Sequence, residues 1–362
     1  MIFLIILLIL IFIIIFILYK SHTFTKSYYH NSANEYFDGI RFKRIGLDEK
    51  VKSVKSISTL AMLGHISGLR KNKELSWESW EEKNISVNQS IPKERVFGDT
   101  IRYYFINHST ILIQTNELNI ITDPIYSKRA GFLIFGPLRV HKAGINFKDL
   151  PKIDLILLSH SHYDHFDNKT LLRLFKRDNP TVITPVGNDF LLKKLNKKFK
   201  VVPLLWNEKT EFKGLKITLV KAYHWTRRTI SDTNKALWGG FVIETESKKI
   251  YFAGDTAFGN EDGKIFKEIG NKFNQIDLAF LPIGAYLPYR FMSNGHTSPE
   301  DSVRIHKLLN AKQSVAIHFG TFQLSAEKRL EPLEDLSKAK EKHGLQENEF
   351  TVLKPSEFGE LK

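Results

Sequence analysis

The sequence predicts an α/β protein in which two β-sheets pack face to face between outer helices. This αββα four-layer sandwich is expected to be preceded by an N-terminal transmembrane helix. Short β-rich runs separated by turn signals begin near residue 100, and segments with helical spacing lie among them. Interspersed strands and helices are typical of sheets whose outer faces are covered by helices. Residues 1–19 form one apolar stretch without a charged side chain.

The apolar stretch has the length of a membrane span. Residues 1–19 are almost entirely Ile, Leu and Phe, and a helix of this length would measure about 28 Å, close to the ~30 Å core of a bilayer. A cleaved signal peptide would have a basic start and a small-residue cleavage site. Neither is present, so we expect an uncleaved single-pass anchor. Lys20 and Lys26 follow the stretch, which favours a cytoplasmic catalytic domain.

Three regions follow from this pattern. They are the anchor (1–19), a membrane-proximal linker and N-terminal extension (20–95), and a catalytic domain (96–362). A hydrophobic fraction of 42% with 25% charged residues excludes a mainly disordered chain. The formal net charge of +14 favours an anionic partner, or it reflects a solvated lysine-rich surface.

The elements of the catalytic domain can be placed in order. Residues 101–122 predict strands joined by a hairpin turn at 115–118. The continuous apolar run 153–159 predicts a strand buried on both faces, and 168–177 predicts a helix with Asp167 or Asn168 as N-cap. Further strands are expected at 181–185, 201–205, 216–224, 239–245, 249–254, 278–283 and 314–320, and further helices at 187–197, 298–310 and 325–343.

One loop carries the strongest chemical signal. The chain has no cysteine, so a metal site must use histidine and carboxylate. The segment "LLSHSHYDHFD" places His160, His162, Asp164 and His165 directly after a buried strand. Residues two apart in an extended loop project the same way, so His160 and His162 can hold one ion. Asp164 and His165 can then face a neighbouring ion, and zinc accepts both ligand types.

One loop cannot complete two coordination shells, so further ligands are expected at the ends of other strands. His224 ends "KITLVKAYH", Asp255 follows "IYFAG", and His318 closes "SVAIH". Each of the three could instead be an ordinary buried histidine or turn aspartate. The H-x-H-x-D-H loop makes the ligand interpretation the better one, because these strand ends can deliver side chains to one rim.

The order of these motifs resembles that of the metallo-β-lactamase superfamily, which runs Asp, H-x-H-x-D-H, His, Asp, His. Asp123 in "IITDP" supplies the first aspartate. The chain is most similar to the N-acyl phosphatidylethanolamine phospholipase D group, over about residues 90–355. That similarity lies in the strings "HWTRRT", "FAGDTAF", "LPIGAYLPYRFM", "GHTSPEDSVRIH" and "AIHFGTF".

The resemblance implies two Zn²⁺ ions, with iron or manganese as alternatives. It assigns His160, His162 and His224 to one ion, assigns Asp164, His165 and His318 to the other, and makes Asp255 a bridge. Asp123 would orient a ligand histidine through its ring N–H. Asp164 and Asp255 would act in catalysis by orienting the nucleophile. His296 could contact the substrate or leaving group, or it could be a structural residue at a helix entry.

The expected function is therefore a membrane-anchored dinuclear zinc hydrolase. A phospholipase D-type phosphodiesterase acting on N-acyl phosphatidylethanolamine or a related phospholipid fits best, with Arg227, Arg290 and Tyr286 as substrate contacts. Arg228 is a further candidate contact with phosphate. A hydrolase of a lactone, ester or small phosphorylated metabolite is the alternative, and a non-catalytic membrane protein is the third. No appended nucleic-acid module is visible, so no nucleic-acid partner is expected. The oligomeric state stays open.

Overall fold

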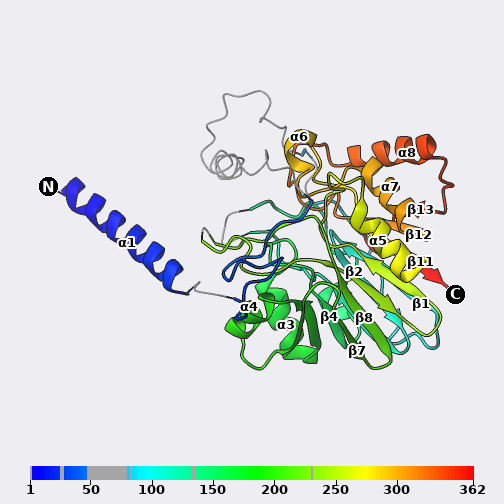
Figure 1. Ribbon diagram of the computed structural model, residues 1–362, viewed down its shortest axis with the longest axis horizontal. Coiled ribbons are helices and arrows are strands. Elements are labelled where there is room, and N and C mark those ends of the chain that lie inside the picture. Colours follow the sequence, from blue (N-terminus) through cyan, green and yellow to red (C-terminus); the bar gives the residue numbers. More distant parts are fainter. Residues whose placement is uncertain (1, 25–27, 47–79, 82–83, 132–135, 230) are drawn as a thin grey trace.

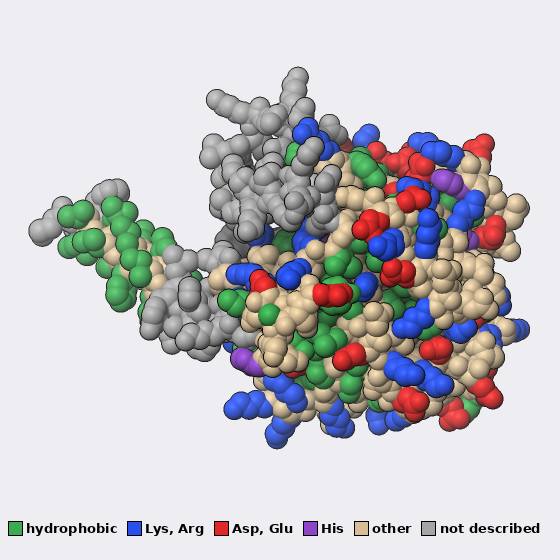
Figure 2. All heavy atoms as spheres, viewed as in Figure 1, with side chains coloured by type: hydrophobic (Ala, Val, Ile, Leu, Met, Phe, Trp, Pro, Cys, Tyr) green, Lys and Arg blue, Asp and Glu red, His purple; other side chains and the backbone are tan. Residues whose placement is uncertain are grey.

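The computed structural model describes residues 2–24, 28–46, 80–81, 84–131, 136–229 and 231–362. Helix α1 (Ile2–Phe24) projects away from the body of the molecule (Figure 1). Its apolar side chains from Leu4 to Ile17 are exposed and form a continuous apolar surface in Figure 2. Within the described part of the chain, no helix has the length and apolar character needed to cross a membrane. The predicted transmembrane helix is thus not supported.

Among the described residues, two mixed sheets of seven strands each form the centre of the fold. The first has the order β14-β1-β2-β3-β4-β5-β6 and the second β13-β12-β11-β10-β9-β8-β7. Their bounds are β1 (Ile101–Asn107), β2 (Thr110–Thr115), β3 (Leu118–Thr122), β4 (Leu155–Leu157), β5 (Thr181–Pro185), β6 (Lys200–Leu204), β7 (Lys209–Phe212), β8 (Leu215–Val220), β9 (Gly240–Glu244), β10 (Lys249–Phe252), β11 (Ile276–Pro282), β12 (Ala311–Ile317), β13 (Phe350–Thr351) and β14 (Phe358–Leu361).

Each sheet has an antiparallel half and a parallel half. In the first sheet β14, β1, β2 and β3 pair antiparallel, whereas β3, β4, β5 and β6 pair parallel. In the second sheet β7, β8, β9 and β10 pair antiparallel, and β10, β11, β12 and β13 pair parallel. The parallel halves matter for function, because the carboxyl ends of their strands share one edge of each sheet.

Helices cover both outer faces, which confirms the predicted α/β architecture with two sheets. The inner faces meet in a core that includes Trp238 and Phe280. Leu171 and Leu192 pack helices α3 (Asn168–Asp178) and α4 (Asn188–Leu195) on the first sheet. Helices α5 (Lys264–Phe273), α7 (Pro299–Leu308) and α8 (Glu331–His343) cover the second sheet, as Figure 1 shows. The described part of the chain also contains the shorter helices η3 (Phe147–Asp149) and α6 (Tyr289–Met292).

Local sequence signals explain most element boundaries. The Asp167 carboxylate caps α3 by accepting from the backbone N–H of Lys169. The predicted hairpin turn between β2 and β3 places Asn116 and Glu117 in the left-handed region. The expected helix at 325–343 begins only at Glu331, which places Pro332 in its first turn, where proline is tolerated. The preceding Glu327 carboxylate accepts from two backbone N–H groups of the loop at 285–287.

Part of the expected linker is packed against the domain. Phe37 and Phe42 are buried in the core between the sheets, and the backbone N–H of Phe42 donates to the carbonyl of Asn234. Residues 28–46 are therefore a folded segment of the body, although we had expected residues 20–95 to form a linker and extension. Residues 47–79 of that region lie outside the described residues. The domain boundaries themselves stay a prediction.

Candidate metal centre

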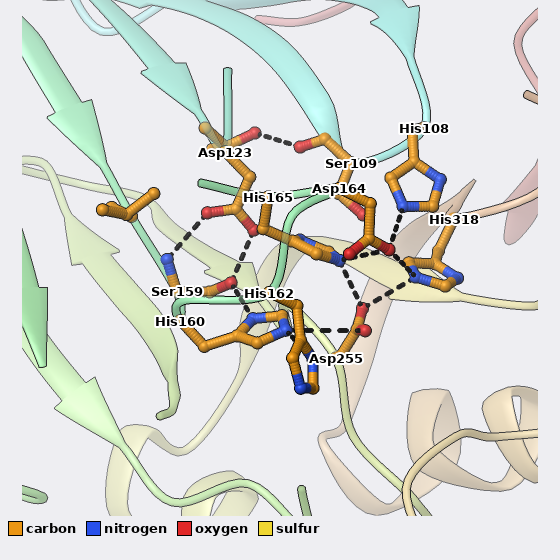
Figure 3. A network of polar contacts seen from close by, with 12 residues as sticks. His108, Ser109, Asp123, Ser159, His160, His162, Asp164, His165, Asp255 and His318 are labelled. Atoms are coloured by element: carbon orange, nitrogen blue, oxygen red, sulfur yellow. Dashed lines mark hydrogen bonds and ion pairs between the residues drawn. The ribbon is translucent and has the colours of Figure 1, made fainter. Parts of the chain in front are cut away.

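The predicted ligands meet at one end of the two sheets, and the close-up in Figure 3 labels all of them except His224. The loop 160–165 follows β4, Asp255 follows β10, and His318 follows β12 directly. His224 lies in the loop after β8, because the expected strand at 216–224 ends at Val220. The carboxyl ends of parallel strands from both sheets thus bring together side chains that are far apart in the sequence.

The first group of ligands contains three imidazoles. His160 Nε2 lies 2.9 Å from His162 Nδ1, and His224 Nε2 lies 3.1 Å from the same His162 nitrogen. The carboxylate oxygen Oδ2 of Asp255 completes the group, at 3.8 Å from His160 Nε2 and 3.6 Å from His224 Nε2. These four atoms surround one position, as the ligands of a single ion would.

The second group adds a second carboxylate. His165 Nε2 lies 3.2 Å and His318 Nε2 lies 3.1 Å from Asp255 Oδ1. Asp164 Oδ2 lies 3.4 Å from His165 Nε2 and 3.7 Å from His318 Nε2. The two oxygens of Asp255 therefore face different groups, one oxygen each, which is the arrangement of a carboxylate that bridges two ions.

The chemistry of these atoms fits divalent metal ions. Ligands bound to zinc at its usual distances in a tetrahedral site are about 3.3 Å apart, and the separations in both groups lie around that value. His165 Nε2, His318 Nε2 and Asp255 Oδ1 are buried without a hydrogen-bond partner among the described residues. A buried polar atom without a partner is costly. A metal ion would satisfy all three atoms at once.

Contacts behind the ligands hold three of the imidazole rings in position. Asp123 Oδ2 accepts from His165 Nδ1 at 2.7 Å, and Gly295 O accepts from His224 Nδ1 at 2.7 Å. The Ser159 hydroxyl donates to Asp123 Oδ2 at 2.5 Å and lies 2.8 Å from His160 Nδ1. Such contacts direct the other ring nitrogen, Nε2, toward the metal.

Three residues at this site have a left-handed backbone conformation. His108, Asp123 and His318 have φ values of 47°, 32° and 61°, in the left-handed region that residues other than glycine adopt at a cost of about 1–3 kcal/mol. Gly254, with φ of 59°, precedes Asp255, and a Cβ placed on it would lie 2.6 Å from the Cβ of Ser159. Glycine is thus required where β10 passes the loop after β4.

The charge states differ between the two groups. Burial lowers the pKa of His160, His162 and His224, to about 3 for His162. Their nitrogen lone pairs are therefore available at neutral pH. Burial alone would raise the pKa of the Asp164 and Asp255 carboxyls, but the adjacent His165 imidazole holds both well below their ordinary value. Both carboxylates are ionised.

In the second group the Asp255 and Asp164 carboxylates, against the effect of burial, raise the pKa of His165 and raise that of His318 to about 9. An ion bound there would therefore displace protons from these rings. The first group needs no such displacement.

Arg228 holds the ligand loop rather than facing it. Its guanidinium donates to the carbonyls of Ser161 and Phe166, which lie on either side of the central ligands. The same group lies over the rings of Tyr163 and Phe166, at 4.2 and 4.7 Å. Arg228 therefore fixes the shape of the H-x-H-x-D-H loop from both ends.

The other predicted substrate contacts lie in different environments. Arg227 lies over Trp225 at 5.3 Å, and that indole packs edge-on against His162 at 4.6 Å, so this pair borders the first group. Arg290 is exposed on α6. Tyr286 is buried and donates its hydroxyl to Asp335 on α8, so the structure does not bring it to the ligands.

Two histidines complete the surroundings of Asp255 and Asp164. His296 Nδ1 lies 3.9 Å from Asp255 Oδ2 and has no hydrogen-bond partner among the described residues. Burial lowers the pKa of His296 to about 4. His108 Nε2 lies 3.1 Å from Asp164 Oδ2, and sequence reasoning missed this residue. It lies in the turn between β1 and β2, and only the pairing of its carbonyl with the backbone N–H of His318 reveals its place.

Comparison with known proteins agrees with this geometry. Residues 118–319 match the family model of a Beta-lactamase superfamily domain. The N-acyl-phosphatidylethanolamine-hydrolyzing phospholipase D 1 of Caenorhabditis elegans is 34% identical over 80% of this chain and 85% of its own length. The mitochondrial N-acyl-phosphatidylethanolamine-hydrolyzing phospholipase D of Saccharomyces cerevisiae is 35% identical over 61% of this chain, which spans 48% of that protein.

Solved structures show the same fold. A metallo hydrolase of the archaeon Ignicoccus hospitalis superimposes with a TM-score of 0.54 at 21% identity, over 73% of this chain and 99% of the archaeal chain. An isothiocyanate hydrolase from Delia radicum gut bacteria gives 0.53 at 20% identity, over 71% and 98% of the two chains. At these identities the similarity concerns the fold alone.

Proposed function

Because this chain belongs to the metallo-β-lactamase superfamily and is related to N-acyl-phosphatidylethanolamine-hydrolysing phospholipases D, we propose that it is a zinc-dependent phosphodiesterase of the phospholipase D type. Its substrate would be N-acyl phosphatidylethanolamine or a related phospholipid. The observation that carries the proposal is the pair of ligand groups that share Asp255, set in a chain whose relatedness to these phospholipases extends over most of its length.

Each ligand group would hold one ion. The first would use His160, His162 and His224, the second would use Asp164, His165 and His318, and Asp255 would contribute one oxygen to each. Zinc fits the nitrogen and oxygen ligands, and iron or manganese would fit them too. Two such ions would supply Lewis acidity and an activated water near neutral pH.

The proposed reaction adds water across a phosphodiester. The bond between phosphorus and the oxygen of the N-acylethanolamine breaks, which releases that alcohol and leaves phosphatidic acid. Asp164 would orient the nucleophilic water, and the contact with His108 would hold its Oδ2 oxygen in place. His296, whose Nδ1 has no partner among the described residues, would contact the phosphate or the leaving alcohol.

Several features suit a lipid with an anionic headgroup. Arg227 borders the first group through Trp225, and a guanidinium matches phosphate oxygens. Arg290 on the exposed side of α6 is a second candidate for headgroup contact. Of the aromatic residues near the ligands, Phe166, Phe258 and Phe322 are buried and serve packing. The exposed apolar side chains of α1 would attach the protein to a lipid surface, which raises the local substrate concentration.

Turnover by the purified full-length chain tests the proposal. Mixed micelles of N-acyl phosphatidylethanolamine are incubated with the metal-loaded protein, and products are read by mass spectrometry. The expected products are N-acylethanolamine and phosphatidic acid, at a rate well above that of a diester with the same headgroup and no acyl chains. Arg227→Ala should reduce lipid turnover more than metal content. Equal rates on both diesters, or a preference for a lactone, would reject the lipase proposal.

Membrane attachment is tested separately by deletion of residues 1–19. The shortened chain should lose binding to lipid vesicles, while its metal content and its turnover of a short-chain soluble diester stay nearly unchanged, because all seven proposed ligands follow residue 159. Unchanged vesicle binding would show that α1 does not attach the protein. Loss of metal would show that the helix supports the folded core.

A further inference from the structure

Arg44, from the folded N-terminal segment, reaches the rear of the metal centre. Its Nε donates to the backbone carbonyl of His224 at 3.1 Å, and its Nη2 donates to the backbone carbonyl of Asn294. His224 belongs to the first ligand group, and Asn294 precedes Gly295, whose carbonyl accepts from His224 Nδ1. One guanidinium thus contacts both loops that determine where the His224 ring lies.

The segment that carries Arg44 is fixed on both sides of this residue. Before it, Phe37 and Phe42 are buried in the core between the sheets. After it, Gly46 lies against Tyr223, since a Cβ on that glycine would be 1.9 Å from the tyrosine ring. The Gly46 carbonyl also accepts from the backbone N–H of Asn260. The dark blue trace of this segment crosses the body of the domain in Figure 1.

We propose that Arg44 is a positioning residue of the metal centre, which ties the loop that carries His224 to the loop that precedes His296. The proposal rests on the assignment of His224 as a metal ligand. The N-terminal segment would then have a function of its own, because its Arg44 contacts the backbone behind the first ligand group.

The chemistry of the side chain suits this task. A guanidinium presents several donors in a fixed plane and can bind two carbonyls at once, whereas a lysine ammonium is a point charge on a flexible stem. Burial lowers the pKa of Arg44 to about 10, so the group remains protonated at neutral pH and all its donors are available. Behind the second group, Asp123 of the first sheet holds His165.

Zinc binding by variants of the full-length chain tests the proposal. Arg44→Met removes the guanidinium and keeps an apolar stem, Arg44→Lys keeps the charge, and Arg41→Met is the matched control. Arg41 lies in the same segment and donates to carbonyls of Ser231 and Thr233 in the loop that follows His224. Stepwise zinc titration against a competing chelator gives the affinity of each of the two ions, and the Co²⁺ absorption spectrum reports the geometry at each.

We expect Arg44→Met to lower the binding affinity for one of the two zinc ions by about 10–100-fold and to alter one component of the Co²⁺ spectrum. Arg44→Lys should fall between this variant and the wild type, and Arg41→Met should stay within about twofold of the wild type. Equal affinities in Arg44→Met and the wild type would overturn the proposal. So would equal losses in Arg44→Met and Arg41→Met, or loss of both ions together with a lower melting temperature.

The outcomes separate this proposal from the proposed function. A wild-type protein that binds two zinc ions but cleaves no phospholipid rejects the lipase function and leaves the role of Arg44 to be decided by the titration. A wild-type protein that binds no zinc rejects both. If Arg44→Met does not fold, the zinc affinities of Arg44→Lys and Arg41→Met are compared instead. A lower affinity for one ion in Arg44→Lys alone supports the proposal, and equal affinities reject it.

Discussion

The two ligand groups differ in charge and in the way their imidazoles are held. The first has three histidines and one oxygen of Asp255. The second has His165, His318, the other oxygen of Asp255 and Oδ2 of Asp164, and His108 lies beside that Asp164 oxygen. Behind the first group, the His224 ring is held by a neutral carbonyl. Behind the second, the His165 ring is held by the Asp123 carboxylate.

This difference concentrates negative charge at the second group. A carboxylate behind an imidazole raises the basicity of the ligand nitrogen, and a ligand carboxylate adds direct attraction for a cation. The second group should therefore hold its ion more tightly. The first group depends on the exact placement of neutral rings, which is where the loops after β8 and α6 and the N-terminal segment meet. Four predictions test this comparison.

The largest effect is expected from the residue that both groups share. Asp255→Asn removes the charge that faces both positions, so we expect loss of both ions and a fall in turnover of about a thousandfold. Metal analysis and kinetics of the purified variant measure this. Asp262→Asn is the control, because Asp262 is exposed and pairs with Arg304 and Lys267. Retention of two ions by Asp255→Asn would contradict the bridging role.

Removing the charge of Asp164 should affect the second group alone. Asp164→Asn is expected to keep the fold and one ion, and to lower turnover by about a hundredfold, because a ligand and the group that orients water are lost together. Circular dichroism, metal content and turnover are the measurements. Near-normal turnover would show that the H-x-H-x-D-H loop is not the catalytic loop.

A smaller effect should follow from the residue behind the second group. Asp123→Asn leaves all seven ligands in place but removes the charge that accepts from His165 Nδ1. We expect the zinc affinity of the second group to fall by about 10–100-fold. The affinity of the first group should fall less, because Asp123 reaches His160 only through the Ser159 hydroxyl. In zinc titrations, Asp123→Asn should mainly lower the affinity of the second group, and Arg44→Met should lower that of the first. A loss of affinity for the same ion in both variants would refute the division into two groups.

The smallest expected effect concerns the intrinsic affinities of the two groups. His224→Ala leaves the second group complete, and His318→Ala leaves the first complete. The ion retained by His224→Ala should bind about tenfold more tightly than the ion retained by His318→Ala, because the remaining ligands carry more negative charge. Competition with a chelator measures both affinities. The reverse order would mean that the placement of the rings outweighs charge.

Patterns within short stretches of sequence predicted much of this molecule. The strands and helices follow the two periods that side chains show in strands and helices, and the two-sheet fold and the family are confirmed. Asp164 and His165 could be proposed as ligands from their neighbours alone. His224, Asp255 and His318 could be proposed because each follows an apolar strand, and strand ends in parallel sheets meet at one edge.

Several features depended on which segments meet in space. His108 reaches Asp164 because a turn of the first sheet pairs with the end of β12 in the second, and Arg44 reaches a carbonyl 180 residues further along the chain. Tyr286 stands in a motif that predicted substrate contact, yet its hydroxyl binds Asp335 on α8. The sequence by itself determined the elements and the ligand types, because these follow from local spacing and side-chain chemistry. Only the tertiary structure decided which side chains support the ligands, because such contacts join residues distant in the chain and leave no periodic signal.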